Sequence, residues 1–584
     1  MTVTTSKSKN ATSYYIKKSL YNDGKITSKV VEKLGNFTDL EERFGKQDTL
    51  KKLDAYVKEL TRKEKEGKQN IMVAYSPSKL IEENVTQLFN CGYFFLQIIY
   101  RELGIENICQ TIQEKCNYDI DLNDVLSRLI YGRILFPASK RSTFELSKRL
   151  IEQPHFELHQ IYRSLGVLGK ETDFIQAELY KNSTKLINRK TGILYYDCTN
   201  YFFEIEQEEG LKQYGYSKEH RPNPIVQMGL FMDGDGMPLA FCINEGNTNE
   251  QITMKPLEKK ILSDFALSKF VVCTDAGLAS ADNRKYNDMG GRAFITTQSI
   301  KKLKQRLQAW ALNPTGWKLP GKSGSYDISQ IENPEYLQQV ANLYGETINP
   351  ETETFYKEQW IKDMEPEQKM LVTYSLKYRN YQRGTRTKQV ERARKMIAKN
   401  PTKLKKANQN DFKRFISKTA VTDGGEVAER ELLNIDLKVI EAEEALDGFY
   451  AVCTNLDDDA QTIIKVNHRR WEIEECFRII KSEFKARPVY LRRDDRIKAH
   501  FTTCFISLLI YRILEKRLGE RFTCSRIISE LRDMNMLEVK REGFIPVYKR
   551  TDFTDALHVA FGLRTDYQIT SHSKMKKIVK LPKT

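Results

Sequence analysis

The chain has 584 residues, enough for three or four domains of ordinary size, so a one-domain protein is not expected. Its 94 Lys and Arg residues against 78 Asp and Glu give a net charge of +16, which suits a polyanionic partner such as nucleic acid. The ten cysteines show no zinc-site spacing, the start shows no signal peptide, and the longest apolar run, near 501–514, is too short and too polar to cross a bilayer. We expect a soluble, cytoplasmic protein with reduced thiols and no membrane partner.

The first third of the chain predicts a small module followed by helices. Residues 14–34 alternate as two strands around a turn at 22–24, and the charged segment 38–66 is helical. From about 77 to 188 the apolar spacing is helical, and basic residues such as Arg128, Arg133 and Lys140 recur in it. This pattern fits a helical DNA-recognition domain, and equally an ordinary helical domain with a solvated basic face. We therefore assign no base-reading residue there.

Two aspartates each follow a short apolar run typical of a buried strand. Residues 193–196 end in Asp197, and residues 270–274 end in Asp275. Further strands are predicted at 225–232, 239–243 and 293–297, with helices at 249–265 and 280–288. The pattern indicates an α/β fold with an RNase H-like core, a mixed five-stranded sheet with helices. An isolated aspartate at such a position is more often a turn former or a helix cap.

Residues 300–440 interrupt the alternation of predicted strands and helices, and they are predicted to form an insertion domain. Within it, the stretch 377–418 holds fifteen Lys or Arg residues against one Glu and one Asp. A charge run of this kind is usually a solvated helix face, but beside the other features it favours contact with DNA phosphates. The predicted DNA-binding residues in this stretch are Arg383, Arg386, Arg392, Arg394 and Lys395.

A helix predicted from about 457 to 484 carries a third acid among cations. Arg470, Glu474, Arg478 and Lys481 share one narrow stripe at 100° per residue. The neighbouring acids at 472 and 475 point away from that stripe, so the geometry selects Glu474. Taken alone, the helix would be read as an amphipathic helix with i,i+4 salt bridges.

Together the three acids suit metal-dependent chemistry on DNA. In-line displacement at phosphorus uses two divalent ions, and hard Mg²⁺ prefers a few carboxylates and retains its waters. We therefore predict Asp197, Asp275 and Glu474 as catalytic, metal-binding residues for two Mg²⁺ ions, for which Mn²⁺ can substitute. Arg470, Arg478 and Lys481 would contact the scissile or flanking phosphates.

These motifs resemble the DDE transposases of bacterial insertion sequences, in the cut-and-paste branch marked by Tyr-x2-Arg-x3-Glu-x6-Lys. Arg470, Glu474 and Lys481 match three of the four signature residues, whereas Asn467 stands at the tyrosine position. Residues 196–199 look like the family's first-aspartate motif, and residues 274–280 look like the second. Residues 214–222 and 246–248 also resemble segments of this branch. The resemblance covers roughly residues 190–300 and 445–515, and the family's large insertion falls between them.

The resemblance implies cleavage at insertion-sequence ends and strand transfer into target DNA. It also implies recognition of terminal inverted repeats in double-stranded DNA, assembly of a homodimer on paired ends, and no small-molecule cofactor. The site of action would be the bacterial cytoplasm, at the nucleoid. Members of this branch often cut through a hairpin intermediate with an aromatic, base-flipping pocket, to which the sequence assigns no residue.

Two alternatives stay open at this point. One is a structure-selective nuclease or resolvase on the same fold, and the other is a catalytically inactive DNA-binding derivative. The expected segments are an N-terminal hairpin and helix module (1–70), a helical DNA-binding domain (71–190), the first part of the core (191–299), the insertion (300–444), the second part of the core (445–518), and a C-terminal region for DNA or dimer contacts (519–584).

Overall fold

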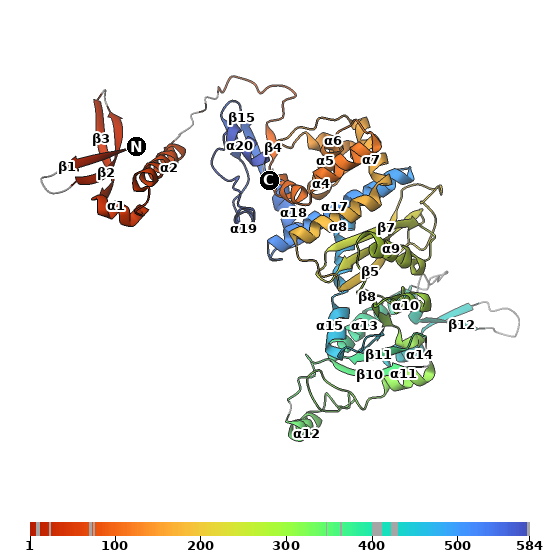
Figure 1. Cartoon of the computed structure of the whole chain (residues 1–584). Coiled ribbons are helices and arrows are strands. Elements are labelled where there is room, and N and C mark those ends of the chain that lie inside the picture. The colour runs from red at the N-terminus through yellow and green to blue at the C-terminus, as the bar shows by residue number, and fades with distance from the viewer. Residues whose placement is uncertain are drawn as a thin grey trace. The chain divides into compact units, whose positions relative to one another are not determined.

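The computed structural model describes residues 1–7, 12–22, 25–68, 73, 76–345, 347–362, 365–399, 411–421 and 430–580. The chain divides into two compact units (Figure 1). One comprises Met1–Val85 with Val539–Glu542, and the other comprises Thr86–Glu538 with Gly543–Thr584. Each unit has its own core and is described by itself.

The N-terminal unit is a three-stranded antiparallel sheet packed on two helices. Its elements are β1 (Thr2–Lys7), β2 (Thr12–Asn22), β3 (Lys25–Gly35), α1 (Phe37–Phe44) and α2 (Thr49–Lys68). Ile16 and Leu34 from the sheet pack against Leu40, Leu53 and Val57 from the helices. The predicted strand pair and helix are confirmed, β1 is an additional strand, and residues 23 and 24 of the predicted turn lie outside the described residues.

The second unit begins with six helices gathered around one long helix. They are α3 (Tyr93–Glu102), α4 (Ile105–Cys116), α5 (Leu122–Leu135), α6 (Lys140–Ser147), α7 (Leu158–Lys170) and α8 (Thr172–Leu186), and the central helix is α17 (Asp494–Arg517). α17 is long and apolar enough to cross a membrane, but 94% of its apolar window is buried within the protein. It therefore serves as the shared core of the helices and the sheet.

An eight-stranded sheet lies at the centre of the second unit, in the order β10-β11-β14-β9-β8-β5-β6-β7. Its RNase H-like part consists of β5 (Ile193–Phe202), β6 (Ile225–Asp233), β7 (Pro238–Glu245), β8 (Val271–Thr274) and β9 (Ala293–Gln298). β5, β6 and β7 pair antiparallel, while β8 and β9 run parallel to β5. α9 (Glu250–Asp264) and α10 (Ala281–Asn287) connect the strands. The five strands predicted from sequence are all present.

Three more strands extend this sheet beyond β9. They are β14 (Phe449–Thr454), β11 (Gln368–Tyr374) and β10 (Phe355–Ile361), all antiparallel to their neighbours. β10 and β11 come from the insertion, which therefore continues the core sheet. Around them lie a 3-10 turn (Ile300–Lys302), α11 (Gln305–Leu312) and α12 (Pro334–Tyr344), packed on a separate hydrophobic cluster.

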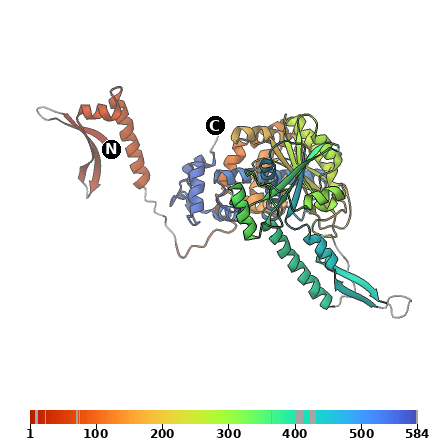
Figure 2. The same ribbon diagram turned by 90° about the horizontal axis from the view of Figure 1, so that it is seen from below.

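The rest of the insertion pairs a long helix with a hairpin. α13 (Leu376–Ala398) runs beside β12 (Ile416–Val421) and β13 (Arg430–Ile435), with a 3-10 turn (Phe412–Phe415) and α14 (Leu437–Glu444) between them and the sheet (Figure 2). Ala393, Phe415 and Ile416 form the buried contact between the helix and the hairpin. Residues 400–410 of the basic stretch lie outside the described residues.

The predicted helix with the third acid is divided into three pieces. α15 (Ala460–His468) ends before a two-residue turn, α16 (Trp471–Arg478) follows, and a π-helical turn (Ile479–Glu483) completes it. The expectation of one continuous helix was therefore wrong. The remaining elements are β4 (Leu88–Asn90), α18 (Cys524–Asp533), β15 (Asn535–Val539), β16 (Gly543–Pro546), α19 (Asp552–Phe561) and α20 (His572–Val579).

Candidate active site

Two of the predicted carboxylates lie on neighbouring parallel strands. The register pairs Tyr195 on β5 with Cys273 on β8, and each aspartate follows two residues later. Because side chains alternate along a strand, Asp197 and Asp275 emerge at the same level and on the same face. One detail of the prediction was wrong: β5 continues past Asp197, because β6 pairs with it along its whole length.

The surroundings of Asp197 disfavour its negative charge. The pKa of Asp197 is raised to about 6, chiefly by burial; the ammonium of Lys218 opposes this rise and the carboxylate of Asp275 adds to it. The backbone N–H of Cys198 donates to Asp197 Oδ1 at 2.7 Å. Two carboxylates that repel each other in a buried site are stabilised when a cation lies between them. The pair is therefore suited to cation binding.

Asp275 also organises the turn that follows β8. Its Oδ1 accepts hydrogen bonds from the backbone N–H groups of Gly277 and Leu278, at 3.0 and 3.1 Å. This is the turn-forming role that an aspartate at the end of a strand often has. Because these bonds occupy Oδ1, Oδ2 is the oxygen of Asp275 that a ligand would contact first.

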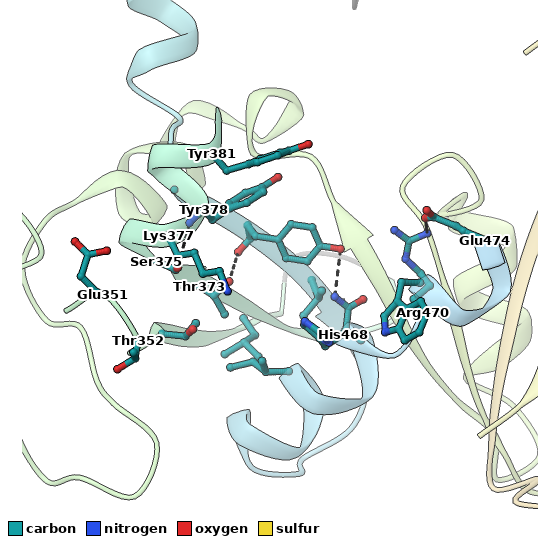
Figure 3. Close-up of a pocket in the computed structure, with 18 residues that line it drawn as sticks. Glu351, Thr352, Thr373, Ser375, Lys377, Tyr378, Tyr381, His468, Arg470 and Glu474 are labelled. Atoms are coloured by element: carbon teal, nitrogen blue, oxygen red, sulfur yellow. Dashed lines mark hydrogen bonds and ion pairs between the residues drawn. The ribbon is translucent and has the colours of Figure 1, made fainter. Parts of the chain in front are cut away.

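Arg470 brings the third acid into the same electrostatic environment. Burial lowers the pKa of its guanidinium, but Tyr450, Glu474, Asp197 and Asp275 together raise it above its ordinary value. Arg470 Nη1 lies 3.6 Å from Glu474 Oε1, and Figure 3 shows the two side chains directed toward each other. This half-buried cation therefore pairs with Glu474 and lies within the electrostatic influence of both predicted aspartates.

The neighbouring acids of the helix have other partners, as the helical geometry predicted. Glu472 accepts from Arg469 at 2.9 Å, and Glu475 bonds Arg478 one turn away. Glu474 remains 61% exposed beside Arg470. Among the three glutamates of α16, Glu474 is the one directed toward Arg470.

The three acids do not form a closed metal cage in this structure. Within the described parts of the chain, only Asp555, His558 and Asp566 have ligand atoms that all lie within 4.8 Å of one another. Arg564 bonds both of those aspartates, so their charge is already compensated. Asp197, Asp275 and Glu474 are farther apart than this, but carboxylate oxygens are the donors that Mg²⁺ prefers.

The two other cations of the predicted stripe point in different directions. Arg478 is 67% exposed and pairs with Glu475, so it faces solvent. Lys481 is 14% exposed, and its Nζ donates to Thr199 Oγ1 on β5 at 2.5 Å. The pKa of Lys481 is lowered to about 8, chiefly by burial and in part by the charge of Lys218. The break before α16 and the π-helical turn separate the side chains that an ideal helix would align.

Two residues near the carboxylates were given no role in the sequence analysis. Lys218 donates to the carbonyl of Cys198 at 2.6 Å and pairs with Glu250 at 3.0 Å. The Tyr450 hydroxyl lies 2.6 Å from Thr297 Oγ1 and accepts from Asn467 Nδ2 at 3.2 Å. A phenol from β14 thus lies beside the residue that stands at the signature's tyrosine position. Only the pairing of β14 with β9 brings it there, so no local motif could have revealed it.

The basic residues of α13 are only partly accessible. Arg392, Arg394 and Lys395 are exposed. Arg383 is half-exposed and lies 3.5 Å from Asp447, whereas Arg386 is buried and binds both oxygens of that aspartate, at 2.5 and 2.7 Å. Arg386 is therefore a structural ion pair, and we exclude it from the predicted DNA surface.

A cavity of about 800 Å³ lies beside Arg470 and Glu474 (Figure 3). Its aromatic lining comes from three elements: Tyr378 and Tyr381 on α13, Tyr450 on β14, and Trp471 on α16. The insertion and the core sheet both contribute to its walls. Aromatic and cationic side chains thus lie next to the candidate carboxylates.

The strand order and the placement of the acids define an RNase H-like enzyme core. The family described as transposase DDE domain matches residues 201–510, just over half of the chain, and the chain belongs to this family. It is therefore a transposase that acts in DNA transposition, and its family generally depends on a divalent metal. The match includes Asp275 and Glu474 and begins after Asp197.

Two solved transposase structures are similar to the chain at low sequence identity. A piggyBac transposase synaptic complex with hairpin DNA is 9% identical, with 84% of each chain covered and a TM-score of 0.34. A Mos1 transposase paired-end complex with the left transposon end is 12% identical, with 41% of this chain and 66% of that chain covered and a TM-score of 0.12. No curated protein matches the chain.

Proposed function

We propose that the protein cuts DNA at the ends of an insertion sequence and transfers those ends to target DNA, with Asp197, Asp275 and Glu474 as its catalytic carboxylates. The observation that carries the proposal is the register of β5 and β8, which brings Asp197 and Asp275 together, with Arg470 3.6 Å from Glu474 and within the electrostatic influence of both aspartates. Acids from β5, β8 and α16 would not share one cation unless the fold directed them to one place.

The three carboxylates would hold two divalent ions, Mg²⁺ or Mn²⁺ in its place. Their hard oxygen donors fit such ions, and the raised pKa of Asp197 reflects negative charge that a cation would relieve. Bound ions of this kind activate the attacking water or 3′-hydroxyl and stabilise the leaving oxygen. The family's general dependence on divalent metals supports this donor set.

The surrounding cations would position the DNA. Arg470 would turn part of its guanidinium toward the scissile phosphate once metal neutralises the acids, and its Nε has no hydrogen-bond partner within the described part of the chain. Lys481, bonded to Thr199 beside Asp197, would contact a neighbouring phosphate as a point charge. Arg478, Arg383, Arg392, Arg394 and Lys395 would bind flanking phosphates from the surface.

The partners would be terminal inverted repeats and target DNA, held by two copies of the chain on paired ends. We place this activity in the bacterial cytoplasm, at the nucleoid. These finer assignments rest on the likeness of the motifs to insertion-sequence transposases of the cut-and-paste branch.

The test is an end-cleavage and strand-transfer assay on the flanking element ends with Mg²⁺. Asp197→Asn, Asp275→Asn and Glu474→Gln should bind the ends but neither cut nor join them. Glu475→Gln, which removes the adjacent surface acid, should retain wild-type activity. If Glu474→Gln still cut the DNA, Glu474 would be excluded as the third metal ligand. If the wild type cut the ends without joining them, the protein would be a nuclease. Binding by the wild type without cutting would identify an inactive derivative.

A further inference from the structure

A second, smaller cavity of about 270 Å³ lies beside the segment that follows the π-helical turn. α5, α6, α7, α17 and residues 485–491 form its walls. The lining contains no Asp or Glu in the described part of the chain. Its basic lining residues are Arg133, Lys140, Lys485, Arg487 and His500.

Three of these basic residues are buried and bond one another or the backbone. Arg133, Lys140 and His500 are 5%, 7% and 5% exposed. Lys140 Nζ lies 3.3 Å from His500 Nδ1, and His500 Nε2 lies 3.1 Å from the carbonyl oxygen of Ala486. The Nε2–H therefore donates to the carbonyl, and Nδ1 accepts from Lys140. His500 is neutral in this arrangement, and Lys140 has no carboxylate partner in the described structure.

Arg133 is also only partly satisfied. Its Nη1 donates to the carbonyl oxygens of Phe484 and Lys485, at 2.9 and 3.4 Å, and its Nε has no partner among the described residues. Among the residues that the structure describes, no acid compensates either cation, and burying charge without such compensation is costly. Burial lowers the pKa of Lys140 to about 7, with the charge of Arg133 adding to the effect. An anion in the cavity would relieve this cost.

The cavity adjoins the candidate active site through two contacts. Val489 N donates to the carbonyl of Phe202, at the end of the strand that carries Asp197, at 3.2 Å. Arg487 contacts Glu219, which also lies 3.9 Å from Lys481 Nζ. Arg487 of the cavity lining and Lys481 of the candidate active site therefore approach the same acid.

We propose that this cavity binds a phosphate group of the DNA backbone, with Arg133 and Lys140 at its base and Lys485 at its edge. The inference rests on the proposed function, because DNA is the source of the phosphate. Arg and Lys are the side chains that bind phosphate, the first with a fork and the second as a point charge. The volume lies just below the ~300–1,000 Å³ of pockets for drug-sized ligands, which suits a small ionic group.

The test measures how salt affects the binding of the full-length protein to duplex element ends. Each phosphate contact contributes about 0.9 to the slope of log affinity against log salt. Lys140→Met should reduce the slope by that amount, so its loss of affinity should be about 3.5-fold larger at 50 mM than at 200 mM salt. Lys485→Met, at an exposed position, should give the same change without altering the core. Lys148→Met, which removes an exposed lysine paired with Glu145 at the end of α6, should leave the slope unchanged.

A wild-type slope in both Lys140→Met and Lys485→Met would overturn the inference while leaving the proposed function intact. Failure of the wild type to bind DNA would overturn the proposed function and the inference together. A thermal unfolding series tests whether the cavity binds free phosphate as well as a phosphate of DNA. Compared with chloride at equal ionic strength, 10 mM inorganic phosphate should raise the Tm of the wild type but not that of Lys140→Met. Stabilisation by phosphate combined with unchanged DNA slopes would assign the cavity to free phosphate and overturn its assignment to DNA.

Discussion

Basic residues are buried in one region of the molecule and exposed in another. Around α5 and α6, Arg133 and Lys140 lie inside the protein, packed against α17. On α13, Arg392, Arg394 and Lys395 remain in solvent. A buried cation must be bonded or compensated by its neighbours, whereas an exposed one is screened by water and salt. Buried cations should therefore act through position, and exposed cations through their summed charge.

The sharpest test of this contrast uses two arginines on one helix. Arg386→Ala removes the bidentate partner of the buried Asp447 and leaves it the half-exposed Arg383 at 3.5 Å, so we expect a loss of about 3 kcal/mol in the free energy of unfolding, the lower end for a broken buried ion pair. Arg392→Ala, an exposed neighbour on α13, should change it by less than about 0.5 kcal/mol. Urea denaturation measures both. If the two variants unfolded with the same free energy, the ion pair between Arg386 and Asp447 would not hold α13 in place.

The next largest effect concerns the cation at the candidate active site. Arg470→Gln removes a half-buried charge that pairs with Glu474 and faces the field of both aspartates, and loss of one preorganised charge of this kind costs about 100- to 1,000-fold in rate. Single-turnover cleavage at saturating DNA should fall by that factor, while DNA affinity changes only a few-fold. If affinity fell and the rate at saturating DNA stayed at the wild-type value, Arg470 would be a binding residue without a role in the chemistry.

The exposed cations of α13 should show the converse behaviour. Replacing Arg392, Arg394 and Lys395 with Ala should reduce the salt slope of DNA binding by about 2.7, since each contact contributes about 0.9. Cleavage at saturating DNA and the free energy of unfolding should stay at wild-type values. A triple variant with normal affinity at low salt would show that α13 does not contact the DNA.

The smallest expected effect is a pH dependence of metal binding. Metal binds the ionised form of Asp197, whose pKa burial raises to about 6, so protonation competes below that pH. Apparent Mn²⁺ affinity, measured by titration calorimetry, should be constant above pH 7 and about tenfold weaker at pH 5. A flat profile over this range would exclude Asp197 as the titrating ligand.

Local sequence patterns were sufficient for the strands and for the choice among acids. A buried strand needs only a run of apolar residues, so β5 and β8 could be predicted from their own residues. Helical periodicity also separated Glu474 from Glu472 and Glu475, which bond other partners in the structure. Periodicity did not reveal the break before α16, because that turn depends on how the segment packs.

The sequence by itself determined the five core strands along the chain, the three candidate acids and the family resemblance, because each follows from short-range periodicity or spacing. Only the tertiary structure decided that Tyr450 lies beside Asn467, that Arg386 is buried, and that Lys140 meets His500. These contacts join residues that are far apart in the chain or lie on faces whose burial no local pattern specifies. Burial then decides whether a charge stays in solvent or takes defined partners inside the fold.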